Sequence, residues 1–281
     1  MVLNFCFSEY AKANIAENFT QPVDYFWNGS PVRKLSIWQD PTDEEVEGAT
    51  LVVFGGGGIQ PKAWRRIRDL VECFPPWLLC VIWGMGINDH GRFDQHYPAE
   101  LAWLEARPNV RIGLRDRFYR KYVPCASCMH PKFETVREVH RPLGLYVHHL
   151  YDLELDGPRL TNVTGGDVAT SFSAVLDFLG SSEVVVTNTY HGAYWATLLG
   201  RRAVVVSPFS NKFFGFPFEP LVFQDCATLA AVGMPALIEL APRYPDALAQ
   251  CRSINFAFHR LVICHSLEFS RRRKTSNLPR R

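Results

Sequence analysis

The sequence predicts an α/β protein in which two Rossmann-like domains face each other across a cleft. Short apolar runs alternate with segments of helical period, several of these runs end abruptly in glycine, and the alternation stops once and then restarts. A chain of 281 residues is long enough to bury two cores without disulfide staples. With 47% hydrophobic and 21% charged residues, the composition argues against disordered, collagen-like and coiled-coil classes.

The first domain is predicted to span residues 1–138. An all-apolar run, LVVF, ends in four glycines, and a segment with apolar residues at helical spacing follows it. The next apolar run again ends in glycine, at Gly84 and Gly86. The predicted order is strand, helix, strand, helix, strand, at residues 51–54, 62–73, 78–83, 100–107 and 110–114.

The domain boundary is predicted within residues 122–142, where three prolines occur and no period is visible. The second domain, residues 139–281, then repeats the alternation. Its predicted strands are 143–147, 184–187 and 203–206, and its predicted helices are 168–179, 191–199 and an amphipathic closing helix within 247–267.

Positive charge is concentrated at the C-terminus. Six of the thirty basic residues lie in the last eleven positions, and without them the net charge of +2 becomes −4. A nucleic-acid partner is therefore not expected, since such a binder carries its basic residues on a folded face. The tail is either a solvated end or a contact to an anionic membrane surface.

The sequence predicts a cytoplasmic protein. The N-terminus lacks the charged-then-apolar layout of a secretory signal, and the longest apolar stretch, residues 77–87, is too short to span a bilayer. Eight cysteines in a chain of this length are too few for a disulfide scaffold. Cys125 and Cys128 form a CxxC pair, but no second such pair completes a zinc site, so no metal is predicted.

Glycines follow two neighbouring predicted strands. In open parallel sheets, ligands bind outside the carboxyl ends of the strands, so these glycines are candidate substrate-binding residues. Their exposed amides near a helix start suit an anion, although the pattern is neither GxGxxG nor a Walker A loop. The alternative for the first group is a tight strand-to-helix turn. The candidates are Gly56, Gly57, Gly58, Gly84 and Gly86.

Arg115 follows the third predicted strand and could place a fixed positive charge in the same cleft. An ion pair with Asp116 or Asp94 is the alternative. His149 and Lys212 also follow predicted strands, and His149 either lines the cleft or simply ends its strand. Lys212, flanked by aromatic residues, fits a sugar or an anion, but its loop could equally be packed by its own aromatic rings.

His191 follows a buried strand and begins a predicted helix. The macrodipole disfavours an imidazolium there, so we expect an uncharged imidazole that acts as a general acid–base or donates to a phosphate or carboxylate. Its neighbours Asn188, Thr189 and Gly192 are candidate substrate contacts. The alternative is a structural cap.

In this order, these landmarks resemble the polysaccharide pyruvyl transferase family. The similarity runs from about residue 10 to 225 and rests on five segments: Asn14-Ile-Ala-Glu17, Phe54-Gly-Gly-Gly-Gly-Ile59, Gly84-Met-Gly-Ile87, Leu114-Arg-Asp116, and Asn188-Thr-Tyr-His-Gly192 with the following Ala196-Thr-Leu-Leu-Gly-Arg-Arg-Ala-Val204.

The resemblance implies a GT-B-like fold and the transfer of a pyruvyl group from phosphoenolpyruvate to two hydroxyls of a saccharide, free or lipid-linked, without a further cofactor. It implies that Arg115 and the glycine loops hold the donor and that His191 is catalytic. The family commonly has Arg-x-His-Gly where this chain has Thr189, so Arg201, Arg202 or Lys212 would have to replace the missing arginine.

Two other functions remain open on the same scaffold. One is a glycosyltransferase that uses a nucleotide sugar, with Glu219 as a candidate ribose-binding acid. The other is a non-catalytic saccharide-binding protein that has lost its chemistry together with the family arginine.

Overall fold

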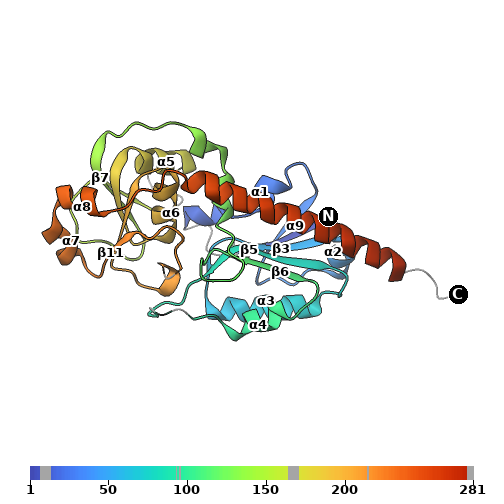
Figure 1. Cartoon of the computed structure of the whole chain (residues 1–281). Coiled ribbons are helices and arrows are strands. Elements are labelled where there is room, and N and C mark those ends of the chain that lie inside the picture. Colours follow the sequence, from blue (N-terminus) through green and yellow to red (C-terminus); the bar gives the residue numbers. More distant parts are fainter. Residues whose placement is uncertain (7–13, 93, 95, 164–170, 214, 277–281) are drawn as a thin grey trace.

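The computed structural model describes residues 1–6, 14–92, 94, 96–163, 171–213 and 215–276. It contains two parallel sheets, each flanked by helices, as Figure 1 shows. The α/β class and the two Rossmann-like units predicted from the sequence are therefore present. The boundary at residues 138 and 139 stays a prediction.

The strands of the first sheet follow the order β2-β1-β3-β5-β4. A sixth strand, β6, lies off this path and pairs with β5. Every pairing is parallel. Its strands are β1 (Val2–Cys6), β2 (Val32–Ser36), β3 (Leu51–Gly55), β4 (Gly58–Ile59), β5 (Leu79–Ile87) and β6 (Val110–Leu114).

Helices cover both faces of the first sheet, which explains why β3 and β5 read as continuous apolar runs. One face packs on α3 (Pro61–Cys73) and α4 (Ala99–Glu105), through side chains such as Trp64 and Leu104. The other face packs on α1 (Val23–Phe26) and on part of the last helix. The short α2 (Asp43–Gly48) precedes β3.

The second sheet has the order β11-β10-β9-β7-β8, again all parallel. Its strands are β7 (Arg141–Val147), β8 (Arg159–Thr161), β9 (Ser182–Thr187), β10 (Arg202–Val206) and β11 (Leu221–Phe223). One face packs on α5 (Phe172–Gly180) and α6 (Tyr190–Leu198), the other on α7 (Cys226–Val232) and α8 (Met234–Leu240). Residues 168–170 of the predicted helix 168–179 lie outside the described residues.

The last helix, α9 (Ala247–Ser276), joins the two units. Its first turns pack in the second core through Cys251, and the helix then crosses the first sheet, which it covers with Phe258, Val262 and Phe269. Figure 1 shows this path in red. Of the basic tail, Arg271 has a described and exposed side chain. Within the described ranges, no helix has both the length and the apolarity needed to cross a bilayer.

Two features differ from the prediction. The expected turn at Gly84 and Gly86 is wrong, because β5 continues through both residues to Ile87. The register with β6 shifts between Trp83 and Met85, and Gly84 has a φ of +64°, so the strand bulges rather than ends. The N-terminal strands were also missed, because Asn4 interrupts the apolar run of β1; its Nδ2 donates to Gln21 Oε1 in the interior.

Short 3₁₀ turns occupy the connections: η1 (Ile15–Phe19), η2 (Ala126–Met129), η3 (Pro131–Glu134) and η4 (Asn211–Phe213). The unpatterned segment 122–142 thus contains η2 and η3, and β7 begins near its end, at Arg141. Cys125 and Cys128 are buried free thiols there.

Candidate functional site

A cavity of about 100 Å³ lies between the two units. Asn88 and Arg115 reach it from just beyond the carboxyl ends of β5 and β6, and His148 and Thr189 from just beyond those of β7 and β9. Loops from both sheets therefore converge where an open parallel sheet places its ligands. We call this space the inner cavity; it is also lined by Glu17, Gly57, Gly58, His90, Tyr146, Tyr190, His191 and Lys212.

Arg115 is a buried cation in the inner cavity, with 3% of its surface exposed. Its guanidinium stacks 3.6 Å from the centroid of the Tyr190 ring, and Nη1 has no hydrogen-bond partner. The alternative ion pairs are not formed. Asp94 pairs with Arg92, and Asp116 Oδ1 accepts the backbone N–H of Phe118.

The glycines around Arg115 create space for it. A Cβ on Gly86 would lie 2.3 Å from Arg115 Nε, and one on Gly58 would lie 3.0 Å from Nη2. The Gly86 amide is not free for an anion, because it donates to the carbonyl of Gly57. These two glycines thus act by letting a cation approach the strand ends.

The other predicted glycines lie in different places. Gly57, with a φ of +69° and open space beside it, lines the inner cavity. Gly56 faces Thr20 and Gln21, and Gly84 faces the backbone of Pro124. Neither Gly56 nor Gly84 lines the inner cavity.

Lys212 brings a second basic side chain to the inner cavity from the opposite unit. Its Nζ lies 3.4 Å from the centroid of the Phe209 ring and 5.2 Å from that of Phe213. Burial and the positive charge of Arg115 hold the pKa of Lys212 well below its usual value. Among the described residues, no carboxylate forms an ion pair with Lys212 or Arg115.

His191 is the second residue of α6, and its ring lines the inner cavity with 9% of its surface exposed. Its Nε2 lies 3.5 Å from the Sγ of Cys125. Burial, then Arg115 and Lys212, hold the pKa of the imidazole well below its usual value. The ring is thus uncharged, as expected, but burial and two cations are the main causes.

The neighbours of His191 build the loop rather than offer free donors. Thr189 is the N-cap of α6, and its Oγ1 accepts the N–H of Gly192 at 2.9 Å. Asn188 accepts the N–H of His148 at 2.9 Å and donates to the carbonyl of Tyr151. Of these three predicted contacts, Thr189 lines the inner cavity.

Unpartnered polar atoms concentrate at this site. Among the described residues, ten buried side-chain nitrogen or oxygen atoms lack a hydrogen-bond partner, and five of them belong to residues lining the inner cavity. Buried polar groups are normally paired, so such a concentration marks a place prepared for a ligand. The five atoms are Glu17 Oε2, Asn88 Oδ1, Arg115 Nη1, Tyr146 Oη and Tyr190 Oη.

Asn88, Tyr146 and Tyr190 were not among the site residues predicted from the sequence. For two of them the sequence position could have indicated the site. Asn88 directly follows β5, and Tyr190 lies between the predicted site residues Thr189 and His191. Tyr146 is the penultimate residue of a buried strand, where an aromatic residue is ordinarily read as core.

A second space, the outer cavity, adjoins the inner one and measures about 270 Å³. The two share Asn14, Glu17, Gly58, Asn88, His90 and His148. Trp38, His149 and Tyr151 line the outer cavity, and His149 Nδ1 lies 2.9 Å from Asn162 Oδ1. Burial, with the charges of Lys212, His149 and His90, lowers the pKa of His148 to about 3, so that ring is also uncharged.

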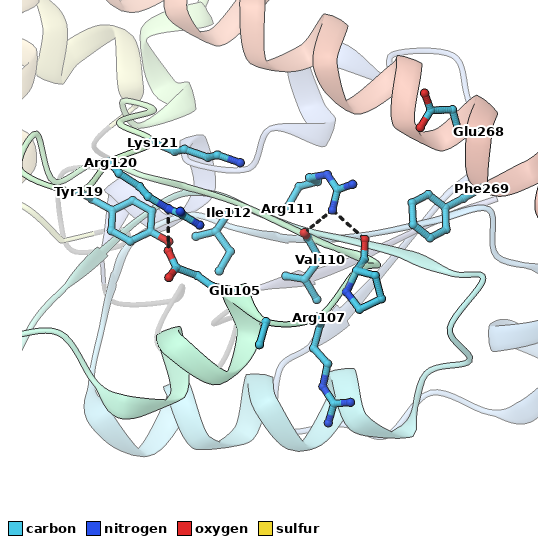
Figure 2. A pocket seen from close by; sticks show the side chains of 12 residues that line it. Glu105, Arg107, Val110, Arg111, Ile112, Tyr119, Arg120, Lys121, Glu268 and Phe269 are labelled. Carbon is cyan, nitrogen blue, oxygen red and sulfur yellow. Dashed lines mark hydrogen bonds and ion pairs between the residues drawn. The ribbon is translucent and has the colours of Figure 1, made fainter.

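A third space of about 380 Å³ lies between β6, α4 and α9 and is drawn in Figure 2. Two of its basic side chains form hydrogen bonds or ion pairs within the protein. Arg111 donates to the carbonyls of Pro108 and Val110, and Arg120 pairs with Glu105. None of the residues predicted for the site lines it.

The described residues contain no group of three or more histidine, cysteine or acidic side chains placed to hold a metal ion. No protein-family model matches this sequence, and no curated protein is significantly similar to it. A crystal structure of a functionally uncharacterized protein from Klebsiella pneumoniae superimposes with a TM-score of 0.46 at 11% identity, covering 73% of this chain and 82% of that one. This likeness is too low to define a shared activity.

Proposed function

We propose that this chain is an enzyme similar to the polysaccharide pyruvyl transferases, which transfers the pyruvyl group of phosphoenolpyruvate to two hydroxyls of a saccharide as a cyclic ketal and releases phosphate. The two units would form a GT-B-like pair. The observation that carries the proposal is the placement of two basic side chains, Arg115 and Lys212, around one small cavity. Neither forms an ion pair with a described carboxylate, and a bound anion would favour the charged form of Lys212.

The charges of the inner cavity match this donor. Phosphoenolpyruvate carries a phosphate and a carboxylate within a few bonds, and two cations from opposite sides can each take one of them. The cation–π contacts with Tyr190 and Phe209 hold both side chains in the cavity before the donor binds. His191, uncharged, then hydrogen-bonds the phosphate without adding a third positive charge.

Lys212 is also the residue best placed to replace the family arginine that is missing at Thr189. Arg201 donates to the carbonyls of Gly180 and Arg137, and Arg202 donates to Glu183 and to the carbonyl of Ala241. Both arginines are thus engaged away from the inner cavity, whereas Lys212 lines it.

The sizes of the two cavities favour a small donor and a larger acceptor. Cavities that enclose drug-sized ligands usually measure about 300–1,000 Å³. The inner cavity, at about 100 Å³, falls below that range, which disfavours a nucleotide sugar there. The outer cavity could take the saccharide, with the rings of Trp38 and Tyr151 against its C–H faces.

The glycosyltransferase alternative finds less support. Its candidate ribose-binding acid, Glu219, pairs with Arg117 on the surface and lines neither the inner nor the outer cavity. The non-catalytic alternative predicts that ligand affinity does not depend on His191.

A thermal-shift titration tests the proposal. We expect phosphoenolpyruvate to raise the melting temperature and UDP-sugars to leave it unchanged, because only a ligand that binds the native state stabilises it. His191→Ala should reduce the shift, since it removes a hydrogen bond to the phosphate. A shift with UDP-sugars alone would overturn the proposal.

Gly86→Ala should weaken phosphoenolpyruvate binding by about tenfold to a hundredfold without unfolding the protein. The new methyl group would overlap the Arg115 side chain and displace its guanidinium group. The donor would then lose one or two charge-assisted hydrogen bonds to this group, which accounts for the expected loss of affinity. Gly48→Ala in α2, where a Cβ would meet only Met1 at 3.9 Å, is the matched control. Equal affinities of the two variants would show that the clearance at Gly86 is not needed.

A further inference from the structure

Glu17 is held over the cleft by contacts to the opposite unit. It lies in η1, where Asn14 Oδ1 accepts the N–H of Ala16. The N–H of Ile15 donates to the carbonyl of Asn162 at 3.1 Å, and Asn14 bridges to Val163 beyond β8. A turn from the first unit is thereby attached to a loop of the second.

The carboxyl group of Glu17 stands where the two cavities meet, since Glu17 lines both. Among the described residues that line them, it is the acidic one. Its Oε2 is buried without a hydrogen-bond partner among the described residues. This oxygen is therefore available to hold a proton and to pass it to a ligand. Glu17 is thus one of the six residues that a ligand extending through both cavities could contact.

Burial raises the pKa of Glu17 to about 7, which leaves the carboxyl group partly protonated at neutral pH. The other charged and titratable groups that line the same two cavities are Arg115, Lys212, Lys62, His90, His148, His149, His191, Tyr146, Tyr151 and Tyr190. An acid is most effective when its pKa lies near the working pH. A bound anionic donor would raise the pKa of Glu17 further, because two negative charges disfavour each other.

The proposed reaction needs an acid that the cations and the uncharged His191 do not supply. We propose that Glu17 is the catalytic acid, which protonates the methylene carbon of phosphoenolpyruvate while a saccharide hydroxyl bonds to the neighbouring carbon. This inference rests on the proposed function and adds a residue and a role to it.

The atoms balance within the site. The Glu17 proton bonds to the methylene carbon, the carbon–carbon double bond becomes single, and the hydroxyl oxygen bonds to the central carbon. The Glu17 carboxylate, now ionised, takes the proton that the hydroxyl loses. The second hydroxyl then displaces phosphate, which closes the ketal ring, and its proton leaves with the phosphate.

Calorimetric titration with phosphoenolpyruvate at pH 8, in buffers of different ionisation enthalpy, measures the protons taken up on binding. At this pH the free Glu17 is mostly ionised, and the bound donor should drive it to take up a proton. We expect wild-type protein to take up about half to one proton more than Glu17→Gln. Glu44→Gln, which removes an exposed acid of α2, should match the wild type.

Phosphate release from phosphoenolpyruvate, with methyl pyranosides that have free 4- and 6-hydroxyls as acceptors, tests the catalytic role. Glu17→Gln should bind the donor but turn over about 10²–10⁴ times more slowly, and Glu17→Asp should recover part of the rate. Equal proton uptake by the wild type and Glu17→Gln, or equal turnover, would overturn the assignment while leaving the donor intact. Absence of donor binding in the wild type would overturn the proposed function as well.

Discussion

Arg115→Met should weaken phosphoenolpyruvate binding by about a hundredfold and leave the unliganded protein at least as stable as the wild type. The guanidinium is buried, and its Nη1 has no partner. Replacing a buried charge by an apolar side chain of similar length is often neutral or stabilising. The lost stacking on Tyr190 opposes this gain by up to about 2 kcal/mol.

The effect on binding should be far larger than the effect on stability. A ligand present at a hundred times its dissociation constant stabilises the native state by about 2.7 kcal/mol, and a hundredfold loss of affinity reduces this to about 0.4 kcal/mol. Thermal-shift titrations of both proteins measure the difference. Arg111→Met, in the third space drawn in Figure 2, is the matched control and should keep the full thermal shift with phosphoenolpyruvate. An equally full shift with Arg115→Met would show that the Arg115 guanidinium does not hold the donor.

Asn255→Ala should destabilise the protein by about 2–4 kcal/mol, because this side chain fastens α9 to the first sheet. It is fully buried. Its Oδ1 accepts the Trp83 Nε1–H at 2.8 Å, and its Nδ2 donates to the carbonyl of Pro124 at 3.2 Å. Truncation leaves both partners unpaired in the interior and opens a cavity beside the Trp83 ring.

Urea unfolding measures the change in the free energy of unfolding. Ser253→Ala, two residues earlier on the same helix and exposed, is the control and should change this free energy by less than about 0.5 kcal/mol. A similarly small effect of Asn255→Ala would mean that α9 docks through its apolar residues alone. The result bears on the cleft, since α9 packs on both units that form it.

The elements most accurately predicted from the sequence are those with strong local patterns. The run LVVF became β3 and the segment 62–73 became α3, because the apolar period of a strand or helix is visible in its own residues. The end of β5 was misjudged for the same reason. Local pattern treats Gly84 and Gly86 as a turn, whereas the neighbouring strands and the Pro124 backbone keep them in a bulged strand.

By itself, the sequence determined the α/β class and several of the parallel strands, with Arg115, Thr189 and His191 beyond their carboxyl ends, because these follow from short-range order along the chain. Only the tertiary structure decided which of those residues share a cavity. Glu17, Arg115 and Lys212 are about a hundred residues apart from one to the next, yet they line one space. Whether a cation is paired, an imidazole is charged or a carboxyl group holds its proton depends on burial and on neighbours from other elements, which appear only when the two units meet.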